Sequence, residues 1–181
     1  MSHRRELFKG FLSELGGHYR KGSADGVLGE TAYTLYEGWD EKAPQIAVIG
    51  GKNEQAKSLT DIGYILHLEN MPDLAELKAN FPQLVAIFFT HNRLLPKKHT
   101  TLGYPLIILN APTHLKLEQR SLFVWEVDEL PADYDAGSFL AKQNCESDVF
   151  ICHGSPWLQA NRAPFVSRVE TFILDCLATI K

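Results

Sequence analysis

The chain has 181 residues, a length that suits a single α/β domain, 1–181, with one hydrophobic core. Apolar residues make up 45% of it, which excludes the low hydrophobicity typical of disordered proteins. The net charge of -4 excludes the broad positive field that non-specific nucleic-acid binders use to displace counterions.

The sequence predicts a cytoplasmic protein with no membrane segment. Arg4 and Arg5 are not followed by the apolar run of a secretory signal, and no stretch reaches the length of a membrane span. The cysteines, Cys145, Cys152 and Cys176, have no Cys-x-x-Cys spacing. We therefore expect neither a disulfide framework nor a thiolate zinc site.

The first predicted element is a helix within residues 1–17, because apolar residues between 7 and 15 recur on one helical stripe before Gly16 and Gly17. Residues 20–44 are rich in Gly, Ser, Asp and Glu, which predicts a long loop with one short edge strand at 33–36.

A regular alternation of strands and helices follows. Short runs of β-branched and aromatic residues predict strands at 46–49, 64–68, 84–89, 106–109, 122–125 and 149–152. Helices are predicted at 53–62, 72–81, 133–143 and 164–181. The last of these places its apolar residues on one face: Phe165, Val169, Phe172, Ile173, Cys176, Leu177 and Ile180. This pattern favours a three-layer α/β/α sandwich, Rossmann-like or glycosylase-like, with a mostly parallel sheet of about five to six short strands. The link between 109 and 122 is too short for a packed helix, so we expect that pair to be antiparallel.

Polar side chains follow most of the predicted strands. Parallel sheets bind ligands at the carboxyl ends of their strands. We therefore predict a pocket lined by Asn53, His91, Asn92, Asn110 and His153. We expect no metal, because the histidines lack ligand spacing.

Two further interpretations concern His67 and Cys152, and a third concerns a possible nucleotide-binding segment. His67 alternates with leucines inside a strand and is interpreted as a packing histidine, and Cys152 as a core residue. The segment from Gly51 to Ser58 nearly matches a phosphate-binding P-loop but lacks one glycine, so a short helix capped by Asn53 is favoured.

The segment that starts at His153 reads His-Gly-Ser-Pro-Trp-Leu, a histidine that leaves a strand into a stiff turn. Two interpretations stay open: the turn presents the imidazole to a ligand, or Trp157 simply covers the core. The segment resembles the closing His-Pro-Ser-Pro motif of the uracil-DNA glycosylase superfamily, with Gly154 in place of the first proline. Residues 106–110 resemble that family's strand ending in asparagine, and residues 89–92 its single-strand-selective members.

The resemblance implies excision of a flipped nucleobase from DNA without a cofactor. Asn110 would read the base, His153 would stabilise the departing base, Asn53 would position water, and Leu158 would fill the vacated stack. His91, Asn92 and Ser155 would complete the binding site. Two alternatives remain: a non-catalytic α/β module that binds a small molecule or a protein, and a degenerate P-loop nucleotide-binding protein.

Overall fold

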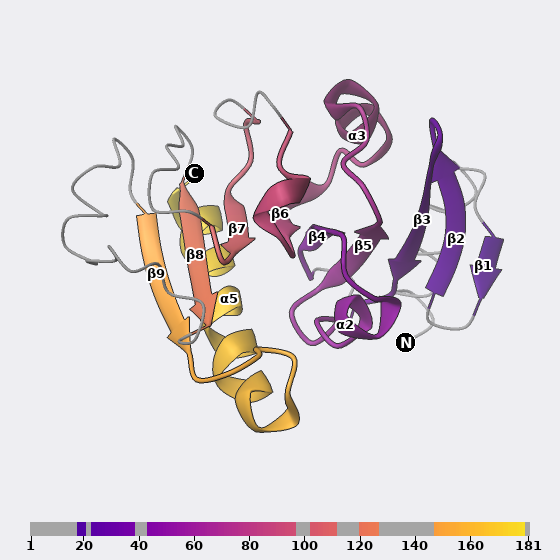
Figure 1. Cartoon of the computed structure of the whole chain (residues 1–181). Coiled ribbons are helices and arrows are strands. Elements are labelled where there is room, and N and C mark those ends of the chain that lie inside the picture. Colours follow the sequence, from indigo (N-terminus) through magenta and orange to yellow (C-terminus); the bar gives the residue numbers. More distant parts are fainter. Residues whose placement is uncertain are drawn as a thin grey trace. The chain divides into compact units, whose positions relative to one another are not determined.

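The computed structural model describes residues 18–20, 23–38, 43–96, 102–111, 120–126 and 147–179 (Figure 1). The chain forms two compact units, unit 1 (Met1–Val85) and unit 2 (Ala86–Lys181), which are described one at a time. The helices predicted at 1–17 and 133–143 lie outside the described residues. The single domain over 1–181 stays a prediction.

The described part of unit 1 holds five strands: β1 (His18–Arg20), β2 (Ser23–Leu28), β3 (Thr31–Tyr36), β4 (Gln45–Ile49) and β5 (Tyr64–Leu68). Their order is β1-β2-β3-β5-β4. The β4–β5 pair is parallel and the other neighbours are antiparallel.

The prediction of a long loop over 20–44 is wrong, because β1, β2 and β3 form an antiparallel meander there. The strand expected at 33–36 is present as part of β3, but it pairs with β2 and β5 and is not an edge strand. The sequence of β2 shows no alternation of apolar and polar residues, because most of its residues are polar or small and only Ala24 and Leu28 are buried. Gly26 pairs with Tyr33, whose ring occupies the space that a side chain at position 26 would fill. Gly29, at a φ of 63°, makes the tight turn that joins β2 to β3.

Two short helices of unit 1 correspond to predicted ones. Helix α2 (Asn53–Lys57) is much shorter than the predicted 53–62, and its N-cap is Lys52 rather than Asn53. The Lys52 N–H donates to Gln55 Oε1 at 2.9 Å. Helix α3 (Leu74–Asn80) begins after Asp73, whose Oδ1 accepts from the Ala75 N–H at 2.8 Å.

Unit 2 begins within β6 (Leu84–Phe89), which is followed by the short 3-10 helix η1 (Asn92–Leu94). Strands β7 (Leu106–Leu109), β8 (Ser121–Glu126) and β9 (Ser147–Cys152) complete the parallel order β6-β7-β8-β9. The antiparallel pair expected between 109 and 122 is therefore wrong, because β7 and β8 run parallel. The α/β class with a mostly parallel sheet is confirmed, with more strands than predicted.

Helix α5 (Gln159–Thr179) follows β9 and buries one face, formed by Phe165, Val169, Phe172, Ile173 and Cys176. This is the apolar period that the sequence predicted. The helix begins before Pro164, which lies inside it, and not at Pro164 as expected. Among the residues that the model describes, no helix is both long enough and apolar enough to cross a membrane.

Candidate functional site

The four strands of unit 2 end at a common edge. Their register aligns one residue from each strand, Phe89, Ile108, Phe123 and Val149. Because the strands are parallel, the residues that follow β6, β7 and β9 leave the sheet at its carboxyl edge. The predicted residues His91, Asn92, Asn110 and His153 all follow these strands, whereas Asn53 belongs to unit 1.

The turn after β6 is organised by His91. Its Nδ1 accepts from the backbone N–H of Arg93 at 3.0 Å and from Arg93 Nε at 3.2 Å. Partial burial, and then the charge of Arg93, lower the pKa of His91 below its ordinary value. A neutral imidazole therefore holds an exposed guanidinium at this strand end.

Asn110 ends β7 and ties it to β8. Its φ of 55° lies in the left-handed region, which asparagine tolerates better than most residues. The Asn110 N–H donates to Val124 O at 2.7 Å, and its Oδ1 accepts from the Glu126 N–H at 3.0 Å. The side chain that was predicted to read a base thus forms a hydrogen bond with the backbone of β8.

Glu126 and Cys152 are register partners at the ends of β8 and β9. Burial, and then the nearby charge of Glu126, raise the pKa of the Cys152 thiol above its ordinary value. Cys152 is 4% exposed, which confirms the prediction that it is a core residue. A buried thiol with a raised pKa is a poor nucleophile at neutral pH.

The loop after β9 is held in place by one asparagine. Asn161 Nδ2 donates to His153 O and to Ser155 O, both at 2.9 Å. Gly154 has a φ of 98°, and a Cβ at that position would lie 3.3 Å from Asn161 Nδ2. The His153 side chain is exposed. The loop therefore presents an imidazole to solvent on a restrained backbone.

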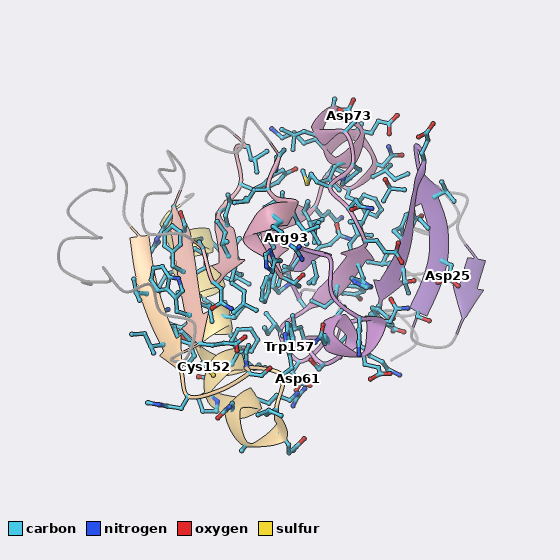
Figure 2. All side chains as sticks on the ribbon, viewed as in Figure 1. Asp25, Asp61, Asp73, Arg93, Cys152 and Trp157 are labelled. Atoms are coloured by element: carbon cyan, nitrogen blue, oxygen red, sulfur yellow. The ribbon has the colours of Figure 1, made fainter. Side chains whose placement is uncertain are left out.

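Aromatic packing fixes the far end of this loop. The ring of Trp157 (Figure 2) stacks on Phe88 of β6 at a centroid distance of 6.0 Å and meets Phe165 of α5 edge-on at 5.5 Å. The Trp157 N–H also donates to Ser155 Oγ at 3.3 Å. Trp157 therefore covers the core, as one interpretation expected. Leu158, beside it, is 57% exposed.

In unit 1, the buried side chain of His67 contacts Gly50 and the exposed residue Asn53. His67 is 5% exposed, with Nδ1 at 2.6 Å from Asn53 Oδ1 and Nε2 at 2.8 Å from Gly50 O. Each ring nitrogen of His67 therefore has a hydrogen-bonding partner within the chain. This confirms His67 as a satisfied packing histidine and shows that Asn53 is bonded within the chain.

Three residues of the unit 2 edge were not predicted as site residues: Arg93, Glu126 and Asn161. Their roles depend on which neighbour each side chain reaches, and spacing alone does not show this. Among the described residues, no three His, Cys, Asp or Glu side chains lie close enough to hold a metal ion.

Comparison by sequence finds no matching family model and no matching curated protein. Comparison of structures finds similar folds. Est1E from Butyrivibrio proteoclasticus aligns over 87% of this chain and 99% of its own, with TM-score 0.52 and 12% identity. An esterase/lipase from an uncultured bacterium aligns over 97% and 92%, with TM-score 0.59 and 11% identity. Dienelactone hydrolase from Anabaena variabilis ATCC 29413 aligns over 90% and 98%, with TM-score 0.52 and 12% identity.

These structures share the α/β-hydrolase fold, which agrees with the predicted α/β class and its mostly parallel sheet. The resemblance to uracil-DNA glycosylases is wrong, and the predicted excision of a nucleobase is wrong with it. The matching pieces were a strand ending in asparagine and a histidine before a Gly-Pro turn. The carboxyl edge of any parallel sheet supplies such features readily. The P-loop and binding-module alternatives gain no support.

Hydrolases of this fold carry a serine in a sharp Gly-x-Ser-x-Gly turn between a strand and a helix, followed in the chain by an acid and a histidine. The sequence contains no Gly-x-Ser-x-Gly. The turn from β6 to η1 reads Thr90-His91-Asn92. Downstream, Glu126 ends β8 and His153 follows β9, in the order acid and then histidine.

Proposed function

We propose that the protein hydrolyses small carboxylic esters at the carboxyl edge of β6, β7, β8 and β9, with His153 as the general base. The hydrolase fold and the similar esterase/lipase structure named above support the substrate class. The observation that carries the proposal is the place of His153. It follows the last strand, downstream of an acidic residue, and a restrained loop holds it out to solvent.

Water is the nucleophile in this proposal, because the turn after β6 offers no serine or cysteine. The His153 imidazole takes one proton from water while the water oxygen adds to the ester carbonyl carbon. The tetrahedral oxyanion then collapses and the bond to the alcohol oxygen breaks. The imidazolium returns its proton to the departing alkoxide, which leaves as the alcohol, and the acid remains. No covalent acyl-enzyme forms.

The restraint of the loop contributes to this chemistry by holding the base near a bound ester. Asn161 ties the backbone on both sides of Gly154, and Trp157 anchors the loop to β6 and α5. A base held in place avoids part of the entropy loss of a bimolecular proton transfer. Exposure of the imidazole lets water reach it without opening the core.

The test is release of 4-nitrophenol from 4-nitrophenyl butyrate. We expect steady turnover without an initial burst, no labelling by a fluorophosphonate, and a loss of about 10²- to 10⁴-fold in kcat/KM for His153→Ala. Ser167→Ala, an exposed change on α5, is the matched control and should behave as the wild type.

Turnover that is equal in His153→Ala and wild type would refute the proposal, as would no detectable turnover in the wild type. A burst accompanied by a fluorophosphonate adduct would refute the water mechanism and point to a nucleophile in the chain.

A further inference from the structure

We infer that Arg93 binds a carboxylate of the substrate, so that the preferred substrates are half-esters of dicarboxylic acids. This inference rests on the proposed ester hydrolysis, because it names the substrate class of the same edge. Its carboxylate-binding part is measurable without turnover.

The first support is the donor inventory of Arg93. Its Nε–H and its backbone N–H both point to His91 Nδ1. The N–H groups of Nη1 and Nη2 remain, and they form the end-on fork that matches the two oxygens of a carboxylate. Within the described part of the chain, Arg93 makes no polar contact besides those to His91.

The second support is the state of the residue that orients the guanidinium. Burial and the charge of Arg93 both favour neutral His91, whose Nδ1 can then accept from Nε. The imidazole thereby fixes one side of the guanidinium without neutralising it. Arg93 keeps its full positive charge in an exposed position, where a carboxylate meets it without the cost of a buried ion.

The third support is the spacing between this cation and the proposed base. Strands β7 and β8 lie between β6 and β9, so the ends of β6 and β9 are about 14 Å apart at a strand spacing of about 4.8 Å. A substrate that touches both groups therefore needs several atoms between its ester carbonyl and its carboxylate.

Among the described residues, Glu126 at the same edge of the sheet makes no contact with Arg93. Glu126 ends β8 and acts on the Cys152 thiol of β9, its register partner. Its backbone N–H is bonded to Asn110. Within the described residues of unit 2, the guanidinium of Arg93 is bonded to the β6 turn, whereas the charge of Glu126 acts on Cys152 of β9.

The kinetic test compares mono-4-nitrophenyl glutarate with its methyl ester, which has the same chain but no charge. We expect the wild type to favour the half-ester in kcat/KM by about tenfold or more, mainly through KM, as a charge-assisted hydrogen bond predicts. Arg93→Gln should bring this ratio close to one. Lys57→Gln removes an exposed cation from α2 and should leave the ratio unchanged.

Calorimetry with glutarate separates this inference from the proposed hydrolysis. We expect wild type and His153→Ala to bind glutarate alike and Arg93→Gln to bind it at least tenfold more weakly. If no ester is hydrolysed but this pattern appears, only the hydrolysis is refuted. If butyrate is hydrolysed but glutarate does not bind, or binds Arg93→Gln as tightly as wild type, the carboxylate site is refuted.

Discussion

His67 in unit 1 and His153 in unit 2 are the same side chain in opposite surroundings. His67 lies inside β5, and both of its ring nitrogens have partners in Asn53 and Gly50. His153 follows β9 and is exposed, and the chain holds its backbone rather than its ring. A polar residue near a strand end therefore indicates a site only when its own hydrogen-bonding groups are left for a ligand.

The same contrast separates Asn110 from Arg93 within unit 2. Asn110 gives its Oδ1 to the backbone of β8, so its side chain supports the edge of the sheet. Arg93 gives only its Nε–H and its backbone N–H to His91 and keeps the rest of its guanidinium exposed. Asn110 therefore stabilises the edge of the sheet, whereas Arg93 offers a charged group to a ligand there.

The largest expected effect concerns the two histidines. His67→Ala should lower the free energy of unfolding by about 2–3 kcal/mol, because it leaves the buried acceptor Gly50 O without its partner and removes the contact with Asn53. His153→Ala should change it by less than about 0.5 kcal/mol, as an exposed side chain predicts. Urea unfolding followed by circular dichroism measures both.

Equal losses of stability in these two variants would contradict the distinction between the bonded ring of His67 and the exposed ring of His153. His67→Gln is an informative companion, because an amide that bonds Gly50 O should recover part of the loss.

A smaller effect is expected at Asn110, where the backbone and the side chain contribute separately. Asn110→Ala should cost about 2 kcal/mol, since alanine disfavours a φ of 55° and the Glu126 N–H loses its acceptor. Asn110→Gly should cost less, because glycine adopts that φ freely. Thermal unfolding of both variants separates the two terms, and a glycine variant less stable than the alanine variant would contradict this account.

The smallest effect is chemical and depends on pH. Because burial and Glu126 raise the pKa of Cys152, its thiolate fraction at a given pH is below that of an ordinary cysteine. Iodoacetamide at pH 8 should leave Cys152 of the folded protein unmodified, and its alkylation should increase only at higher pH. Glu126→Gln should raise the rate slightly.

Peptide mass spectrometry locates the modified cysteine, and the urea-unfolded chain, in which every thiol reacts, is the control. Rapid alkylation of folded Cys152 at pH 8 would show that the ends of β8 and β9 are more open than their contacts imply.

The parallel strands were predictable because each is a short run of β-branched and aromatic residues that a doubly covered sheet requires, as in β6 and β7. The meander of β1, β2 and β3 was not predictable in the same way. Its buried face is made by few residues, and Tyr33 covers Gly26 from the neighbouring strand. From sequence alone, a glycine in a polar segment predicts a loop, because the residue that packs against it from the neighbouring strand is not known.

For the candidate site, too, the sequence predicted some features and not others. The sequence placed His91, Asn110 and His153 at the ends of strands, because an apolar run that stops at a polar residue marks the edge of a sheet. It did not show that Asn110 and Asn53 bond to their own chain or that Arg93 folds back on His91. A short motif that resembles another family misled for the same reason, since its residues have neighbours that spacing does not reveal.

The sequence by itself determined the alternation of strands and helices, the buried face of α5 and the polar residues that end the strands of unit 2. These follow from local period and from the chemistry of each residue. Only the tertiary structure decided the strand order, the hydrolase-like fold and which polar groups remain exposed. Those depend on contacts between residues distant in the chain, such as His67 with Gly50 and Trp157 with Phe88.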